Sequence, residues 1–313
     1  MKSPVVIKRL PSYVLDGAKP ISRSRSNTFK MKIDQDSVVE YLGVRRFNES
    51  CLEVFPGARS MKSAYSSAIG VLFLMGILCD VIIFNVLPGP YSTEILVSFF
   101  VLPVISAAIG GLLYVMARGS QGSYVRINRN TRRIYYVVPG ELRLVTLEWQ
   151  EIQPMAGNII VAGGAAGHTV FNPLFLVGVD WTKSPPQEAA ISCGNVGWRD
   201  YGQSASELFT YIQQFMDNGP QGLPTPGPLP PKMSRKETFL HGYRQWAKKF
   251  REDLSTPKGK RWAVLWALAK VLWLITIVFP DSIGAYLDYS IPEVKFSAEI
   301  DALCGFDSNS SNA

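Results

Sequence analysis

The chain has few of the side chains that enzymes use for acid–base or metal chemistry. Its 313 residues include two histidines, His168 and His241, and four cysteines without a CxxC spacing. A Ser-His-Asp or Cys-His catalytic set would need one of these histidines, and a metal site needs three or four clustered ligands. The GGAAG stretch at 163–167 lacks the lysine and hydroxyl of a P-loop. We therefore expect no enzymatic activity, no catalytic residue, no metal site and no cofactor.

Basic residues are absent from the middle of the first half of the chain and abundant on both sides of it. The net charge is +7, with twelve Lys or Arg in residues 1–62, none in 63–117 and eighteen in 118–261. Membrane proteins retain basic residues on the cytoplasmic side. We expect residues 1–62 to be a basic cytoplasmic leader, which has no apolar signal-peptide core, and we expect no nucleic-acid partner.

Two long apolar runs, 64–87 and 95–117, occupy this region without basic residues. At about 1.5 Å per residue, 24 residues span roughly 36 Å, which exceeds the ~30 Å hydrocarbon core of a bilayer. A short PGPYSTE turn separates the runs. The pattern predicts a transmembrane helical hairpin over 63–118, with small residues four apart, such as Ser106 and Gly110, favouring close packing.

Asp80 is the one acidic residue within the first run. A carboxylate in a membrane helix indicates a functional site by default. The alternative is an interfacial residue that reaches polar surroundings or caps the helix, because Asp80 lies close to the predicted outer turn.

Residues 119–219 alternate between apolar and polar side chains, as half-buried strands do. Strands are predicted in this region, followed by an amphipathic helix over 205–216. The leader stretch CLEVF, 51–55, is predicted to be a strand that joins the same sheet. About six antiparallel strands closed by a helix is the order of a pleckstrin-homology-like (PH-like) domain. The predicted strands cover 124–128, 133–138, 142–149, 159–161, 169–179 and 189–193.

The remaining third of the chain divides into four segments. Residues 220–234 are a proline-rich linker and 235–260 a basic amphipathic helix expected on the cytoplasmic membrane face. Residues 261–280 are predicted to be a third transmembrane helix, leading to an acidic tail, 281–313, outside the cell. Lys270 lies within this third run and needs a partner if the run spans the membrane. Otherwise the run lies along the bilayer surface.

Basic side chains near the membrane are the candidate binding residues. One group follows the hairpin and the other lies on the amphipathic helix, and both are placed to meet anionic lipid headgroups or a protein partner. Charge that only fixes orientation, without a ligand, explains them equally well. The candidates are Arg126, Arg129, Arg132, Arg133, Lys248, Lys249 and Arg251.

The order of parts resembles a known family. Two close-spaced helices, the alternating YVRINRNTRRIYYV and then YIQQFMDNGPQGLP with a proline-rich linker are similar to uncharacterised proteobacterial membrane proteins. FMDNGP, at 215–220, is the most specific piece. Genes of that family often lie beside type VI secretion effectors. The resemblance covers about residues 50–280 and implies a role in interbacterial toxin loci, with no catalytic residues.

The sequence thus predicts a membrane α plus soluble β-rich α+β protein of the bacterial inner membrane. It is multi-pass, with its N-terminus and β domain in the cytoplasm. The expected function is that of an immunity or accessory protein, acting by binding a toxin or secretion-system protein or lipid. The alternative is an effector whose helices insert into a target membrane.

Overall fold

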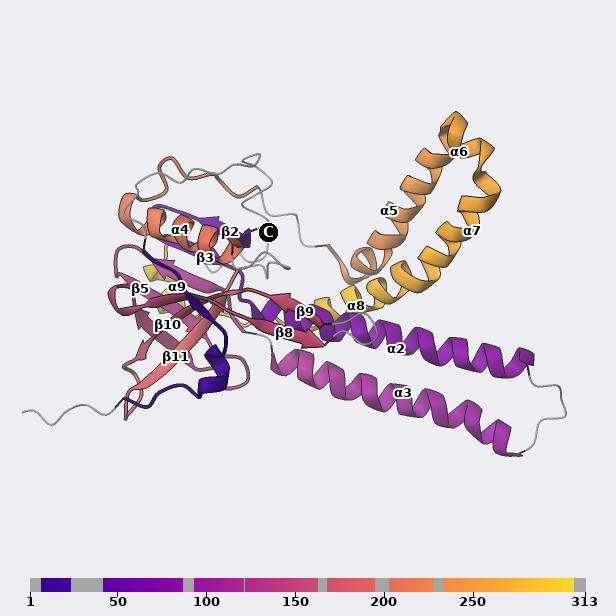
Figure 1. Ribbon diagram of the computed structural model, residues 1–313, viewed down its shortest axis with the longest axis horizontal. Coiled ribbons are helices and arrows are strands. Elements are labelled where there is room, and N and C mark those ends of the chain that lie inside the picture. Colours follow the sequence, from indigo (N-terminus) through magenta and orange to yellow (C-terminus); the bar gives the residue numbers. More distant parts are fainter. Residues whose placement is uncertain are drawn as a thin grey trace, which may run out of the picture. The chain divides into compact units, whose positions relative to one another are not determined.

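A computed structural model describes residues 7–23, 42–86, 93–120, 122–162, 168–194, 203–227 and 233–306 (Figure 1). The chain divides into two compact units. The β unit comprises residues 1–60, 122–231 and 293–313, and the helical unit comprises 61–121 and 232–292. The helical unit is therefore made from two insertions, each of which leaves the β unit and returns to it.

Two antiparallel sheets form most of the β unit. Alternating β-branched and aromatic residues favour these strands. The five-stranded sheet has the order β2 (Val44–Phe47), β3 (Cys51–Val54), β4 (Val125–Asn128), β5 (Arg133–Val137) and β6 (Leu144–Glu148). The four-stranded sheet has the order β1 (Lys19–Pro20), β7 (Gln153–Ala156), β10 (Leu174–Asp180) and β11 (Gln187–Cys193). Short 3-10 helices lie at Ser12–Leu15 and Trp149–Glu151, and β8 (Ile159–Ala162) pairs with β9 (His168–Phe171).

The first insertion separates two strands that are neighbours in the sheet. β3 pairs with β4 from Cys51 opposite Asn128 to Val54 opposite Val125. The prediction that the leader supplies a strand to the later sheet is confirmed. The strands on either side of the insertion are joined by hydrogen bonds, so the insertion leaves from the end of β3 and returns at the adjacent start of β4.

The inner core lies between the two sheets and α4 (Gln203–Asn218). One apolar face of α4, including Leu208, Ile212 and Phe215, is buried, and Phe209 stacks on Trp149 at 5.9 Å between ring centroids. The predicted helix over 205–216 is confirmed within two residues at each end. The start of the linker also packs here, because Tyr211 donates a hydrogen bond to the Pro224 carbonyl oxygen at 2.8 Å.

The opposite face of the five-stranded sheet is buried as well. β3 and β4 are buried at every position, because the segment 293–306 packs on this outer face. It contains α9 (Ala298–Leu303). Ser297 caps the start of this helix, because its hydroxyl accepts a hydrogen bond from the Ile300 amide. The expected acidic tail over 281–313 is therefore wrong as a description of 293–306, which is part of the β unit's fold.

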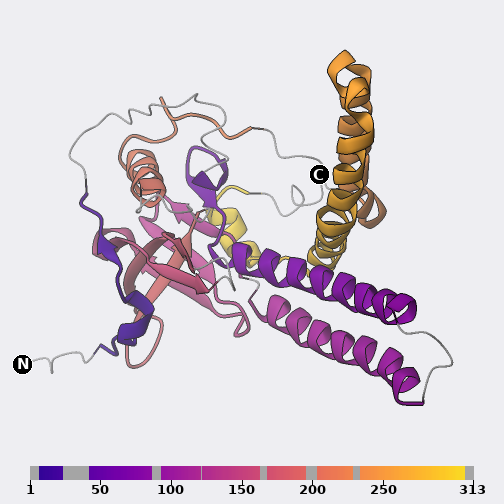
Figure 2. The ribbon, with the colours of Figure 1, turned by 45° about the vertical axis from the view of Figure 1, so that its right-hand side comes forward.

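Two long helices form the first insertion, α2 (Ala58–Val86) and α3 (Thr93–Gly119). They run side by side in both views (Figures 1 and 2). Small residues set their contacts: a Cβ on Gly76 would lie 3.3 Å from the Ser106 hydroxyl, and one on Gly110 3.6 Å from Ile69. The packing role predicted for Ser106 and Gly110 fits these contacts.

The second insertion is a hairpin of α5 (Arg235–Ser255) and a long bent helix, with α6 (Pro257–Arg261) between them. The long helix consists of α7 (Ala263–Trp273), a π-helical stretch Leu274–Val278 and α8 (Phe279–Ser290). Pro280 has no amide hydrogen to donate, and its ring crowds the preceding turn, which accounts for the wider helix just before it. The helix therefore continues beyond 280, where the predicted span ends.

By length and composition, Trp266–Leu287 is the one helical stretch in the described ranges that is long and apolar enough to span a membrane. Shorter apolar stretches, Ala68–Ile82 and Pro103–Gly119, lie in α2 and α3. The antiparallel sheets and helices confirm the α+β class. The strands form two separate sheets with another of two strands, an arrangement that does not by itself define a PH-like barrel.

Candidate functional site: a buried ionic cluster under the C-terminal segment

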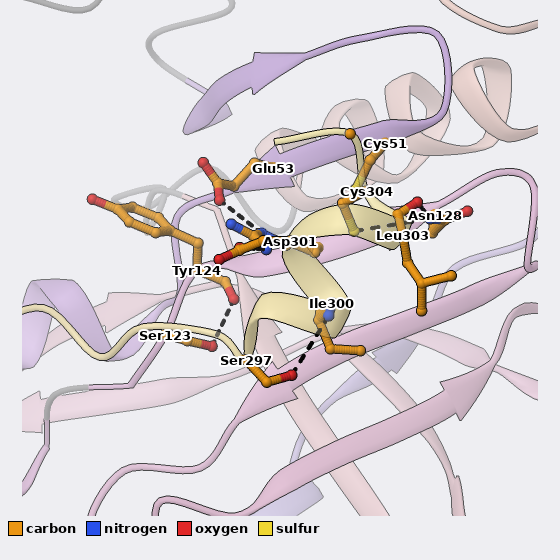
Figure 3. Close-up of polar contacts among 12 residues, drawn as sticks. Cys51, Glu53, Ser123, Tyr124, Asn128, Ser297, Ile300, Asp301, Leu303 and Cys304 are labelled. Atoms are coloured by element: carbon orange, nitrogen blue, oxygen red, sulfur yellow. Dashed lines mark hydrogen bonds and ion pairs between the residues drawn. The ribbon is translucent and has the colours of Figure 1, made fainter. Parts of the chain in front are cut away.

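Five charged side chains meet where the segment 293–306, hereafter the C-terminal segment, covers the outer face of the five-stranded sheet. We call them the ionic cluster. Figure 3 shows two of them, Glu53 and Asp301. Glu53 on β3 and Arg126 on β4 are directly opposite in the strand register. Strand alternation turns both side chains away from the inner core, towards the C-terminal segment. The cluster consists of Arg45, Arg46, Glu53, Arg126 and Asp301.

Glu53 is the centre of the ionic cluster. Its side chain is completely buried and accepts from Arg45 and Arg46, each at 2.7 Å, and from Arg126 at 3.0 Å. Burial acts to raise the pKa of Glu53, but the hydrogen bond from Arg46 and the three guanidinium charges outweigh it and lower the pKa. Glu53 is therefore a carboxylate near neutral pH.

Arg126 connects the sheet to the C-terminal segment. Its side chain is 6% exposed, binds Glu53 on one side and forms an ion pair with Asp301 of α9 on the other. Its guanidinium carbon also lies 4.1 Å from the centre of the Phe296 ring. Burial acts to lower the pKa of Arg126, and the hydrogen bonds and charges of the two carboxylates outweigh it and raise the pKa. The charge of Arg126 is thus fully compensated.

Neutral polar groups complete the docking of the C-terminal segment. Asn128 donates from Nδ2 to the Leu303 carbonyl oxygen and Asn48 to that of Cys304, both at 2.8 Å. The Tyr124 hydroxyl donates to Glu293 at 2.9 Å. Buried carbonyls need such partners, so the sheet satisfies the end of α9. The site is therefore built for specific recognition of one segment.

The four predicted arginines do not form one basic surface. Arg126 is buried in the ionic cluster, and Arg133 pairs with Glu148 at 2.8 Å. Arg132 donates to the Met216 carbonyl oxygen and lies 3.7 Å from Asp217. The Arg129 guanidinium lies against Gly219, where a Cβ would come within 2.9 Å of it. Neighbouring arginines on the strand and the turn therefore contact different residues. The four side chains do not come together as one binding site for lipid headgroups.

The second predicted basic group lies on α5. Lys248, Lys249 and Arg251 are exposed there. The apolar side of α5 contacts the following helices and is not free for the membrane face, since Phe250 lies 5.2 Å from Trp266 and Phe239 lies 6.4 Å from Tyr286.

A groove of about 720 Å³ lies between α5 and the α7–α8 helix. Trp246, Trp266 and Trp273 line it, together with Lys249 and Lys270. Trp246 donates to the Lys270 carbonyl oxygen at 3.1 Å. This groove is a second concave surface of mixed apolar and basic character.

The two predicted intramembrane polar residues differ in their contacts. Lys270 has the partner that the sequence required, since its Nζ lies 2.8 Å from the Asp253 carboxylate of α5. Asp80 has one carboxylate oxygen that is buried without a hydrogen-bond partner among the described residues.

In the described ranges, the two histidines lie on different elements, and no metal-ligand cluster is present. His168 begins β9, and His241 lies on α5, 2.8 Å from Gln245. No group of three or more His, Cys, Asp or Glu side chains in the described ranges is placed to hold a metal.

Sequence reasoning missed Arg45, Arg46, Glu53 and Asp301. A signal was present, because CLEVF and YVRIN each place a charge between apolar residues of a strand. Comparisons of the chain with protein families, curated proteins and solved structures find no match.

Proposed function

We propose that this chain is a membrane-anchored binding protein whose β domain is held at the cytoplasmic face of a bacterial inner membrane. The observation that carries the proposal is the apolar surface of the inserted helices. Monomeric soluble proteins rarely expose large contiguous apolar areas, and a bilayer would cover these side chains. Exposed large apolar residues are Val71, Phe73, Met75, Ile77, Val81 and Ile82 on α2, Val104, Ile105, Leu112 and Val115 on α3, and Leu268, Leu272 and Trp273 on α7.

The connections between the units support one topology. Each insertion begins and ends at the β unit, so each crosses the membrane an even number of times. For α2 and α3 this means a spanning hairpin. The positive-inside bias places the β unit in the cytoplasm.

The second insertion does not fit a single crossing by 261–280. A crossing there would put the C-terminal segment outside, away from Arg126 and Asn128, which bind it. α5 is also too polar to span, since nine of its 21 residues are charged. We propose that the α5–α8 hairpin lies in the cytoplasmic interface, with Lys248, Lys249 and Arg251 towards anionic headgroups.

The biological role proposed is that of an immunity or accessory protein of a type VI toxin locus. The support is the resemblance of the sequence to that family of proteobacterial membrane proteins. Such a protein would bind a toxin or a secretion-system protein. A membrane-inserting effector is the alternative that the exposed apolar helices favour.

Replacing each insertion separately tests the anchor. Residues 59–121 are replaced by a short Gly-Ser turn joining β3 to β4, and in a matched variant 233–291 by a Gly-Ser linker. We expect the first variant to be released from membranes by alkaline carbonate and the second to resist it. Release of both or of neither would contradict the proposed anchor.

Two phenotypes separate the proposed role from the alternative. Deletion of the gene should make the strain sensitive to a sibling strain's toxin, and expression of the protein alone should leave the membrane potential unchanged. Depolarisation on expression, measured with a potential-sensitive dye, would favour the effector.

A further inference from the structure

Two thiols meet where the C-terminal segment joins the sheet. Cys51 lies on β3 and Cys304 follows α9, and both are completely buried in the same cluster (Figure 3). Cys51 lies directly opposite Asn128 in the register of β3 and β4. Asn128 contacts Cys304 as well, with its Nδ2 3.8 Å from the sulfur. The fold thus brings together two cysteines from opposite ends of the sequence.

The two thiols have different acidities. Burial raises the pKa of Cys51, and the neighbouring Cys304 adds to this. The hydrogen bond from Cys51 lowers the pKa of Cys304 against the effect of burial, and the Arg126 charge and the Asn128 amide lower it further. Cys304 is therefore the sulfur that more readily becomes a thiolate, the reactive form of cysteine.

The other two cysteines lie on different elements. Cys193 belongs to the inner core, on the far side of the five-stranded sheet, and burial raises its pKa. Cys79 lies in α2. Neither belongs to the cluster that holds the pair under the C-terminal segment.

We propose that Cys51 and Cys304 are a peroxide-responsive dithiol whose oxidation ties the C-terminal segment covalently to β3. This inference goes beyond the proposed function and needs no toxin partner; its reduced resting state rests on the proposed cytoplasmic location of the β unit. In the cytoplasm, where thiols are kept reduced, the resting state is the dithiol. When the short C-terminal segment opens locally, a small hydroperoxide can reach the buried dithiol.

The chemistry balances with a hydroperoxide as the oxidant. The Cys304 thiolate attacks one peroxide oxygen, the O–O bond breaks, and the leaving oxygen takes a proton, which gives a sulfenic acid. The Cys51 sulfur then attacks Cys304, an S–S bond forms, and the S–O bond breaks. The released hydroxide takes the Cys51 proton and leaves as water. Two thiols and one hydrogen peroxide give one disulfide and two waters.

Thiol counting on the full-length protein in detergent tests the inference. The protein is treated with hydrogen peroxide, denatured and labelled with a maleimide mass tag on each free thiol. The reduced chain takes four tags, one for each free cysteine. After peroxide we expect two tags, a monomer on a non-reducing gel, and a linked peptide pair containing Cys51 and Cys304.

Variants identify the sulfurs. Cys79→Ser should still lose two tags on oxidation, whereas Cys51→Ser and Cys304→Ser should lose none to a disulfide. The wild-type peptide map decides the question without any variant. Four tags after peroxide, a different cysteine pairing, an intermolecular disulfide or oxidation of Cys304 without a disulfide would each overturn the inference.

Discussion

At the scale of single residues, the stability of the β unit depends on a charge that the sheet buries. Arg126 compensates both Glu53 and Asp301 and stacks on Phe296. Removing one partner from a buried ion pair leaves the other charge desolvated, which costs about 3–5 kcal/mol. The C-terminal segment should detach from the sheet when this charge is lost.

We therefore expect Arg126→Ala to lower the free energy of unfolding by about 3–5 kcal/mol. Arg133→Ala is the matched control on the neighbouring strand, because its ion pair with Glu148 is exposed and worth about 0–1 kcal/mol. Denaturant unfolding followed by tryptophan fluorescence measures both. Equal losses in the two variants would show that the ionic cluster does not hold the C-terminal segment.

Glu53 gives the β unit a predictable response to acid. Its pKa is lowered in the folded protein, so the stability it contributes is present above its unfolded pKa of about 4.3. That contribution is lost as the pH falls through the lower folded pKa. Thermal unfolding from pH 7 to below pH ~4 should show a steeper loss in wild type than in Glu53→Gln. Glu148→Gln should keep the wild-type slope.

The residue scale is also where sequence reasoning was least complete. Arg126 was predicted as a ligand-binding residue because it lies near three other arginines in the sequence. Pairing of β3 with β4 instead places it opposite Glu53. The spacing of residues along the sequence predicts neither this strand register nor the ion pair between Arg126 and Asp301.

At the scale of elements, the helices pack through glycine. A Cβ on Gly70 of α2 would lie 2.2 Å from the carbonyl oxygen of Pro280 in α8, so the two helices cannot keep their spacing with any larger residue. A Cβ on Gly111 of α3 would meet nothing within 4 Å. We expect Gly70→Ala to destabilise the helical unit by about 1–3 kcal/mol, as overpacking does.

Gly111→Ala is the matched control, because it makes the same chemical change in an open position of a neighbouring helix. Thermal unfolding of both variants in the same detergent checks the prediction. A midpoint for Gly70→Ala equal to that of Gly111→Ala would mean that α2 and α8 do not pack closely.

Element boundaries were predicted well where periodicity is strong and poorly where packing partners are distant. The strands around 124–138 and the helix over 205–216 follow from alternation and amphipathicity. The apolar face of α5 was also recognised, but its partner was not. Phe250 meets Trp266 of the next helix, a contact that local pattern cannot distinguish from burial in a membrane surface.

At the scale of the whole molecule, the fold links the two ends of the chain. β2 and β3 from the leader and the C-terminal segment belong to one unit, and Arg126 and Asn128 bind its last helix. In the proposed topology, a third crossing by 261–280 would separate the C-terminal segment from the sheet that binds it. The sequence favoured that crossing because a hydropathy pattern describes each apolar run separately. The contacts of Arg126 and Asn128 with the C-terminal segment join residues that are far apart in the sequence.

Reporter fusions test this arrangement directly. We expect a green-fluorescent fusion at Met1 and another at Ala313 both to fluoresce, because both ends belong to the β unit, which the proposed topology places in the cytoplasm. A phosphatase fusion at Ala313 should be inactive, whereas one inserted in the 88–92 turn should be active, since that turn faces outside in the proposed topology. An active phosphatase at Ala313 together with fluorescence at Met1 would place the C-terminal segment across the membrane from the sheet. That result would contradict the docking of the C-terminal segment on Arg126. It would not contradict the membrane anchor formed by α2 and α3, which the carbonate extraction tests separately.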